Sequence, residues 1–206
     1  MSESGQEIEA KFYLLHPDKM ITRLQTLQAR LIQSRVLEIN LRFDLPNHSL
    51  RSQGKVLRLR RDTEAKLTYK GAGKNNSGVL GREEIEFVVN DFEKARQFLK
   101  ALGYQQTMVY EKYRETYELD DALIMLDELP YGNFIEIEGE NVEQVQAIAS
   151  RLELDAKAAI PTSYTALFEN IRRSLQLRFE DISFANFRGI KVSSANMGVR
   201  AADNQP

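Results

Sequence analysis

The sequence contains no cysteine and only two histidines, His16 and His48. The lack of cysteine excludes disulfide bonds, zinc sites built from thiolates and a cysteine nucleophile. Two imidazoles argue against a histidine-based metal centre, and we expect His16 at the start of a helix and His48 in a loop. Any metal that this protein binds must therefore be held by oxygen atoms.

Charge and hydropathy exclude further classes of partner. The formal net charge is −2, so the chain has no excess of positive charge for nucleic acid or an anionic membrane. No apolar run approaches the roughly 18 residues that a membrane-spanning helix needs, and the N-terminal segment lacks the apolar region of a signal peptide. We therefore expect a cytoplasmic protein with no nucleic-acid and no membrane partner.

The composition is that of a globular protein, since 42% of the 206 residues are hydrophobic and 28% are charged. This length predicts one domain with a sizeable core. We expect a main domain over residues 1–175, a segment over 176–192 that packs on that domain, and a disordered polar tail over 193–206.

Residue spacing predicts a series of strands interrupted by a few helices. The expected strands are residues 7–15, 31–44, 56–61, 65–70, 82–89, 107–119, 123–129 and 134–138. The expected helices are residues 17–28, 92–102, 142–152 and 164–175. The glycine-rich stretch 71–78 is expected to be a flexible loop, because no Gly-Lys-Ser/Thr sequence opens a helix there.

The first expected strand alternates charged and apolar residues. Glu7, Glu9 and Lys11 lie on one face of such a strand, and the apolar residues between them lie on the other. An ordinary solvated strand face can have this pattern, so this strand alone decides nothing.

Later strands repeat the alternation with complementary charges. The charged groups that share a face within one strand are Arg58 and Arg60; Lys66 and Lys70; Arg82, Glu84 and Glu86; Lys112 and Arg114; and Glu136 and Glu138. Several of the opposite faces carry large apolar residues, which must pack against helices. In an open sheet the charged faces would be merely solvated, whereas in a closed barrel with external helices they converge in the interior.

A charged interior is costly unless a ligand compensates the like charges. Clustered carboxylates favour a divalent cation, and ligands that are all oxygen favour Mg²⁺ or Mn²⁺. Clustered Arg and Lys favour an anion with many oxygens, and paired guanidinium groups suit phosphate. A metal ion bridged to a polyphosphate satisfies both requirements.

These segments resemble the CYTH superfamily, the triphosphate tunnel metalloenzymes. Glu7-Ile-Glu-Ala-Lys11 is similar to the ExExK signature, and the charged strands follow in the family's order. Asp127 precedes the ExE ending at Glu136 and Glu138, and Ser163-Tyr-Thr-Ala-Leu167 is similar to the SY-x-x-L segment. The resemblance covers about residues 5–175. It implies an α+β fold in which an eight-stranded antiparallel β-barrel forms a tunnel flanked by helices.

The resemblance also implies a role for each matching residue. The implied metal ligands, for Mg²⁺ or Mn²⁺, are Glu7, Glu9, Asp127, Glu136 and Glu138. The implied substrate-binding residues are Lys11, Arg58, Arg60, Lys66, Lys70, Lys112 and Arg114. The implied catalytic residues are Glu84, Glu136 and Lys11, with Glu84 or Glu136 as the base that activates water. Glu84, Glu86 and Asp127 are further candidates to complete the metal shell or orient water.

One position departs from the family pattern. Arg42 stands where family members often have tyrosine, in a strand that reads Asn40-Leu-Arg-Phe-Asp44 here. The change argues against a thiamine triphosphatase, and the added cation favours a small, highly charged substrate such as tripolyphosphate. We expect a metal-dependent hydrolase that releases the terminal phosphate of a triphosphate. A class IV adenylate cyclase and a non-catalytic polyphosphate-binding module stay open as alternatives, as does a homodimer.

Overall fold

The computed structural model describes residues 6–76 and 79–203. Its strands are β1 (Gln6–Leu14), β2 (Arg30–Asp44), β3 (Val56–Arg61), β4 (Ala65–Lys70), β5 (Lys74–Asn76), β6 (Val79–Val88), β7 (Gln105–Leu119), β8 (Ala122–Leu129) and β9 (Gly132–Glu138). Its helices are α1 (Pro17–Thr26), α2 (Ser49–Ser52), α3 (Phe92–Ala101), α4 (Val142–Arg151), the 3₁₀ turn η1 (Ala156–Ala158), α5 (Tyr164–Leu175) and α6 (Ser194–Met197).

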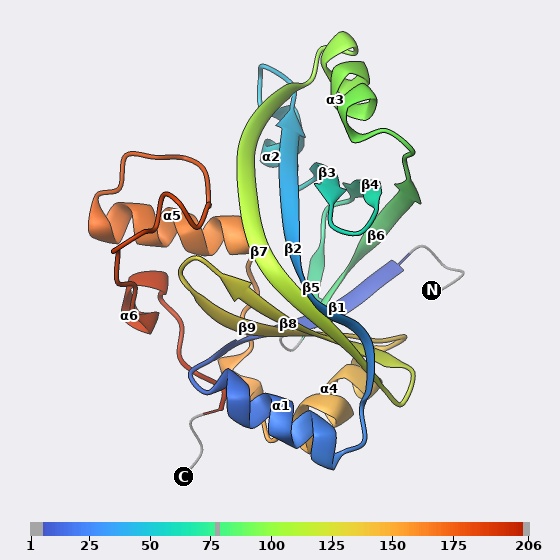
Figure 1. The fold of residues 1–206 in the computed structure, drawn as a ribbon, viewed down its shortest axis with the longest axis vertical. Helices are drawn as coiled ribbons and strands as arrows, with labels where there is room; N and C mark the ends of the chain where they lie inside the picture. The colour runs from blue at the N-terminus through green and yellow to red at the C-terminus, as the bar shows by residue number, and fades with distance from the viewer. Residues whose placement is uncertain (1–5, 77–78, 204–206) are drawn as a thin grey trace.

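Eight of the strands form a closed antiparallel barrel. Their order is β1-β9-β8-β7-β2-β3-β4-β6, and a further pairing between β6 and β1 closes the ring. The short β5 pairs only with the start of β6, outside this ring. The long, curved β2 and β7 form the most extensive pair (Figure 1). The predicted α+β fold with an eight-stranded barrel is confirmed.

Apolar residues on the outer face of the barrel hold helices against it. Phe12 and Ile137 on the strands, with Leu24 of α1 and Ile148 of α4, belong to one buried cluster. Both helices lie at the same end of the molecule in Figure 1, and α3 lies at the other end. There Leu99 of α3 is buried in a separate cluster on the outside of β2 and β3. Burial of each such side chain contributes about 1.5–3 kcal/mol.

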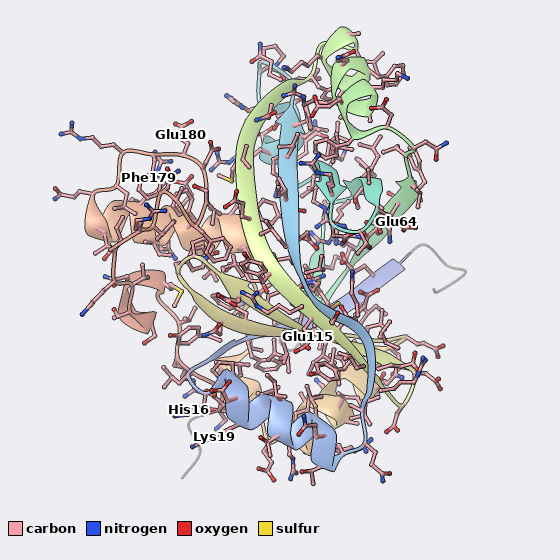
Figure 2. The ribbon with its side chains drawn as sticks, in the orientation of Figure 1. His16, Lys19, Glu64, Glu115, Phe179 and Glu180 are labelled. Carbon is pink, nitrogen blue, oxygen red and sulfur yellow. The ribbon has the colours of Figure 1, made fainter. Side chains whose placement is uncertain are left out.

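A third cluster joins α5 and the C-terminal segment to the barrel. Tyr13 and Phe134 of the strands pack edge to face, with ring centroids 5.5 Å apart. Tyr164 and Phe168 of α5 and Phe187 of the following segment belong to the same buried group. In segment 176–192, Ile182 is buried and pairs with Tyr110 of β7. Phe179 lies in the same segment (Figure 2).

Local sequence signals start most of these helices where we expected. Asp91, Asn141 and Ser163 each accept a hydrogen bond from the backbone N–H of the third residue that follows. Such caps satisfy one of the unpaired backbone donors at a helix start. Helix α1 instead has Pro17 in its first turn, directly after His16, which makes no side-chain cap (Figure 2).

Two parts of the chain differ from the sequence-based expectation. Residues 74–76 and 79–81 pair as strands β5 and β6, so the flexible loop predicted over 71–78 is wrong for that part; residues 77 and 78 lie outside the described ranges. The predicted disorder of the tail is wrong up to residue 203. Ser193 caps α6, Met197 is fully buried, and Ala201 pairs with Tyr13. Small residues allow this close packing, although their polarity favours disorder. Residues 204–206 lie outside the described ranges.

Within the described ranges, no helix combines the length and apolar character needed to cross a membrane.

Candidate functional site

The interior of the barrel is lined by the charged faces of the strands. Directly paired residues on neighbouring strands have their side chains on the same side of a sheet. The register therefore places the following charged side chains in the interior: Glu7, Glu9, Lys11, Glu38, Arg42, Arg58, Arg60, Lys66, Lys70, Arg82, Glu84, Glu86, Lys112, Arg114, Asp127, Glu136 and Glu138. Every substrate-binding, metal-binding and catalytic residue that the sequence predicts belongs to this set.

Carboxylates gather where β6, β1 and β9 adjoin, and we refer to Glu7, Glu9, Glu84 and Glu138 as the acidic wall. Glu9 lies directly opposite Glu138 in the β1–β9 register, an arrangement of like charges that is unfavourable without compensation. Burial and then the nearby carboxylates of Glu7, Glu84 and Glu9 raise the pKa of Glu138 to about 7, although Lys70 opposes them. The acidic wall therefore holds more negative charge than its neighbours neutralise.

Two cations from adjoining strands hold part of the acidic wall. Lys70 forms an ion pair with Glu7 and lies 3.2 Å from Glu84. Arg82 donates to Glu7 over 2.7 Å and lies 3.5 Å from Glu9. Although burial raises it, the pKa of Glu7 falls to about 2 because of Lys70 and Arg82. Arg82 is a site residue that the sequence analysis did not assign, although its parity with Glu84 was visible.

Beside the acidic wall, Glu136 is held by two cations. Lys11 lies 2.8 Å from Glu136, and Arg114 donates a hydrogen bond to it. These cations hold the pKa of Glu136 well below its usual range, against the effect of burial. In return, Glu136 and Glu9 raise the pKa of Lys11, which burial alone would lower.

Asp127 lies on β8 and is surrounded by donors. Its two oxygens accept hydrogen bonds from Arg114 over 2.6 Å, Lys112 over 2.9 Å and the hydroxyl of Tyr164 over 2.8 Å. Three of these hydrogen bonds go to Oδ2 and one goes to Oδ1, so the observed arrangement suits a residue that positions Arg114 and Lys112. Its assignment as a metal ligand stays a prediction.

Cations gather on the interior faces of β2, β3 and β4, and we refer to Arg42, Arg58, Arg60 and Lys66 as the basic wall. Arg42 lies directly opposite Arg58, and Arg60 lies directly opposite Lys66. The Nε atoms of Arg58 and Arg60 are buried and have no hydrogen-bond partner among the described residues. The basic wall thus combines like-charged neighbours with unused donors.

Three carboxylates partly neutralise the basic wall, and one of them, Asp62, lies 3.7 Å from Arg60. Glu86 lies 3.5 Å from Arg58, 3.2 Å from Arg60 and 3.5 Å from Lys66. Glu38 is almost fully buried and lies 3.5 Å from both Arg60 and Lys112. Against the effect of burial, Lys112 and then Arg114, Arg58 and Arg60 lower the pKa of Glu38. The sequence analysis missed Glu38, which alternates with Leu37 and Ile39 and could have been assigned from that pattern.

The two walls face each other. In a closed ring of eight strands, strands that are four places apart in the order lie on opposite sides of the interior. The observed order therefore sets β1 opposite β2 and β9 opposite β3. A ligand in the interior thus contacts carboxylates on one side and guanidinium groups on the other.

The donor set of the acidic wall fits a divalent metal ion, because carboxylate oxygens are the ligands that Mg²⁺ and Mn²⁺ prefer. Burial and then the neighbouring carboxylates raise the pKa of Glu138. A bound cation would offset the negative charge of these carboxylates. In the conformation described for residues 6–76 and 79–203, no three acidic or imidazole side chains are already arranged around a metal position. Lys70 and Arg82 occupy Glu7 instead, so metal binding requires these side chains to move.

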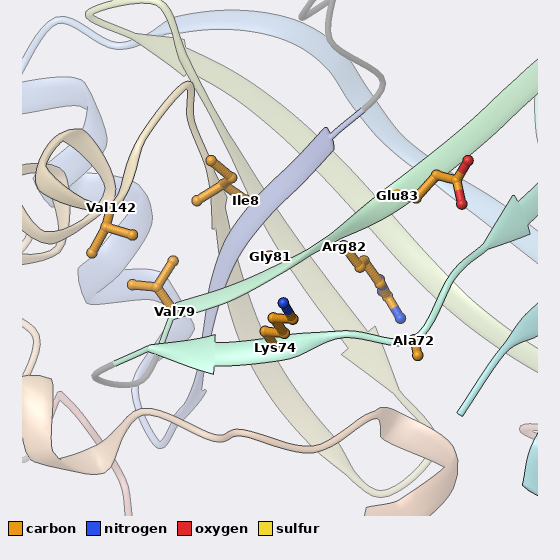
Figure 3. Close-up of a pocket in the computed structure, with 8 residues that line it drawn as sticks. All are labelled: Ile8, Ala72, Lys74, Val79, Gly81, Arg82, Glu83 and Val142. Atoms are coloured by element: carbon orange, nitrogen blue, oxygen red, sulfur yellow. The ribbon is translucent and has the colours of Figure 1, made fainter. Parts of the chain in front are cut away.

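A separate hollow of about 300 Å³ lies outside the barrel (Figure 3). Ile8, Val79 and Val142 form its apolar side, and Lys74 lies at its edge on β5. Glu83 points away from Lys74 in this view. Because the hollow offers few polar groups and lies on the outer face of β1 and β6, we do not assign the site to it.

Comparison with known proteins identifies the family of this chain. The sequence matches the CYTH domain family over residues 5–168. It is 30% identical to adenylate cyclase CyaB of Aeromonas hydrophila over 189 residues, which are 85% of this chain and 94% of that protein. The closed eight-stranded antiparallel barrel flanked by helices defines the fold class, and this chain belongs to the CYTH family.

Solved structures show the same fold. A putative adenylate cyclase of Vibrio parahaemolyticus superposes with a TM-score of 0.72 at 20% identity, covering 81% of this chain and 99% of that one. A putative adenylyl cyclase of Hippeastrum, described as having a dominant triphosphatase activity, superposes with a TM-score of 0.62 at 21% identity, covering 79% and 95%. Enzymes of this family generally depend on a divalent metal.

Proposed function

We propose that this protein is a divalent-metal-dependent hydrolase of triphosphates, with inorganic tripolyphosphate as the preferred substrate. The observation that carries the proposal is the facing pair of walls. Glu9 and Glu138 are directly paired carboxylates, and Arg42 and Arg58 are directly paired guanidinium groups across the interior from them. A metal-bound phosphate chain relieves both repulsions at once.

The acidic wall would hold the metal through Glu7, Glu9 and Glu138, with Glu84 beside them. The bound metal supplies Lewis-acid stabilisation of phosphoryl charge. Asp127 and Glu136 remain candidate ligands, although both are already bound by cations in this conformation. Metal binding by Asp127 or Glu136 would require these ion pairs to break, which costs free energy. Glu84 and Glu138 form fewer ion pairs among the described residues, so this cost is smaller for them.

The cations of the interior hold the phosphate chain. Arg58, Arg60, Lys66, Lys112 and Arg114 surround it and neutralise the charge that develops on the transferred phosphoryl group. Lys11 and Lys70 extend the same lining toward the acidic wall. Preorganised donors of this kind contribute more in a dehydrated interior than in water, because the local dielectric constant is lower.

Glu84 is the better candidate to accept the proton of the attacking water. Its carboxylate lies 3.2 Å from Lys70. Burial, together with the neighbouring carboxylate of Glu7, raises the pKa of Glu84, which suits a group that accepts a proton. Glu136, the other candidate base, is engaged by both Lys11 and Arg114. No covalent nucleophile is needed for this reaction.

A class IV adenylate cyclase is the second candidate, because a relative at 30% identity is named an adenylate cyclase. The same residues would hold ATP while its ribose 3′-hydroxyl attacks the α-phosphate and pyrophosphate leaves. A module that only binds polyphosphate is the third candidate. It is less favoured because such a protein gains nothing from the repulsion between Glu9 and Glu138.

One assay separates the three candidates. The purified full chain is given tripolyphosphate, ATP or thiamine triphosphate with Mg²⁺ or Mn²⁺, and released phosphate and cyclic AMP are measured in parallel. We expect phosphate from tripolyphosphate above all, and no cyclic AMP. Cyclic AMP as the main product of ATP would establish the cyclase instead. Binding without turnover of any substrate would leave only the binding module.

A further inference from the structure

Arg42 differs from every other interior cation in its contacts. Eight interior cations each lie within 4.0 Å of at least one carboxylate: Lys11, Arg58, Arg60, Lys66, Lys70, Arg82, Lys112 and Arg114. Among the described residues, the guanidinium group of Arg42 has no carboxylate within that distance and donates no hydrogen bond. It is nevertheless only partly exposed.

The neighbours of Arg42 make its isolation more costly. Arg58 is its direct partner across the β2–β3 ladder. Burial and the positive charges of Arg58, Arg82 and Arg51 lower the pKa of Arg42, and only Tyr110 opposes them. A partly buried cation without a counter-ion destabilises the empty protein. An anion bound at this point would compensate the charge of Arg42.

Arg42 and Arg58 are also the last charged pair at their end of the basic wall. The next interior position on β3 is the apolar Val56. The next on β2 is Asp44, whose carboxylate accepts the backbone N–H groups of Leu50 and Arg51 at α2. An anion held by Arg42 and Arg58 thus lies at the end of the basic wall on β2 and β3, where one end of a bound phosphate chain would lie. Beyond it the charged lining continues only on the β4 side, where Lys70 pairs with Val56 among the described residues.

We propose that Arg42 is a specificity-determining residue that binds the terminal phosphate of an inorganic phosphate chain. The proposal rests on the proposed function and deepens it. Both ends of tripolyphosphate are free phosphoryl groups, so either end satisfies Arg42 and Arg58 together. In the proposed arrangement the γ-phosphate of a nucleoside triphosphate lies toward the acidic wall, so its esterified α-phosphate lies at Arg42. That phosphate brings less negative charge and an uncharged ribose, which leaves part of the basic wall unpaired. Arg42 therefore selects inorganic chains over nucleotides.

The test compares Arg42→Gln with Arg42→Lys, and uses Arg30→Gln as a matched control. Arg30 lies at the other end of β2, is exposed and pairs with Glu118 over 2.7 Å. Binding of tripolyphosphate and of ATP is measured by calorimetry without metal, and kcat/KM for both is measured with Mg²⁺. Loss of a charged hydrogen bond should weaken tripolyphosphate binding by Arg42→Gln about 10- to 100-fold.

Three outcomes would distinguish a binding role of Arg42 from a merely structural one. Arg42→Gln should weaken ATP binding far less than tripolyphosphate binding, and Arg42→Lys should restore part of the loss. Without ligand, Arg42→Gln should keep or raise the melting temperature, since it removes an uncompensated charge. Arg30→Gln should leave both affinities unchanged.

Equal losses for tripolyphosphate and ATP would overturn the selective role, and unchanged tripolyphosphate affinity would overturn any role in binding. The two proposals can fail separately. Full turnover of tripolyphosphate by Arg42→Gln would refute the inference and keep the hydrolase. Selective binding through Arg42 without turnover by the wild type would refute the hydrolase and keep the inference. If the wild type binds no tripolyphosphate, both are wrong.

Discussion

The acidic wall and the basic wall both contain repelling like charges, but neighbouring side chains neutralise these charges to different extents. Each contains like charges that are direct partners across strands, Glu9 with Glu138 in one and Arg42 with Arg58 in the other. The carboxylates of the acidic wall form ion pairs with cations, chiefly Lys70 and Arg82. The cations of the basic wall form ion pairs with the carboxylates of Glu86 and Glu38. Neither carboxylate lies within 4.0 Å of Arg42.

This difference shows how the empty barrel stays folded with a charged interior. Most charged groups of the two walls form ion pairs with neighbouring side chains, which neutralise them in the absence of a ligand. Buried ion pairs of this kind contribute little net stability. Under the proposed function, a metal ion and a phosphate chain would each displace existing ion-pair partners on binding. Glu138 and Arg42 are the groups that this internal pairing satisfies least, and they lie on opposite walls.

The largest effect is expected from Glu9→Gln on the acidic wall. Loss of a metal ligand should reduce metal-dependent turnover by more than the roughly 100-fold that loss of an outer-shell partner costs. Stability without metal should not fall, because the variant relieves the repulsion with Glu138 while Glu7 keeps Arg82 and Lys70. Turnover and metal-induced shifts in melting temperature would be measured together.

The matched control is Glu115→Gln, which removes a carboxylate from the outer face of β7 (Figure 2). It should leave both readouts unchanged. Near-normal metal-dependent turnover by Glu9→Gln would contradict the ligand assignment, and so would an unchanged thermal response to Mg²⁺ or Mn²⁺.

A smaller effect of mixed sign is expected from Glu86→Gln on the basic wall. The substitution removes the carboxylate that Arg58, Arg60 and Lys66 share. The free energy of unfolding without ligand should fall by about 1.5 to 3 kcal/mol, the range for hydrogen bonds to charged groups. Tripolyphosphate should then bind more tightly, since it no longer competes with Glu86. Urea unfolding and calorimetry would measure the two changes; weaker binding would show that Glu86 itself helps to hold the substrate or its metal.

The sequence predicted most of the barrel because strand parity sorts side chains between two faces. The alternation in Glu7–Phe12 and in Leu57–Arg60 already separates interior charges from the apolar residues on the outside. The register gives what alternation alone cannot: it sets Glu9 against Glu138 and Arg42 against Arg58. These pairings depend on which strands become neighbours, which local patterns do not specify.

Local composition does not predict the structure where tertiary contacts decide it. The small and polar residues after 193 suggest disorder, yet Met197 is buried and Asp203 accepts the backbone N–H groups of Leu15 and His16. The interior position of Glu38 is hard to predict because the residues at the start of β2 are exposed. Irregular pairing of β2 between residues 31 and 36 also disturbs the alternation before Glu38. Asp127 matched a family position, but its donors became known only from the fold.

The smallest effect is expected from Tyr164→Phe, which tests whether Asp127 acts by positioning the cations between the two walls. The hydroxyl of Tyr164 donates to Asp127 over 2.8 Å, and Asp127 holds Arg114 and Lys112. Tyr131→Phe is the matched control, because its buried hydroxyl donates over 2.9 Å to the backbone carbonyl of Tyr164 and not to Asp127.

Each variant should lose about 1 kcal/mol of unfolding free energy, the usual contribution of one hydrogen bond. Only Tyr164→Phe should also lower kcat for tripolyphosphate, by a few-fold, because the cations beside Asp127 become less fixed. Equal kcat values in the two variants would show that Arg114 and Lys112 alone keep Asp127 in place. A loss of turnover as severe as that of Glu9→Gln would instead mean that Tyr164 contacts the substrate, and that the interior lining extends onto α5.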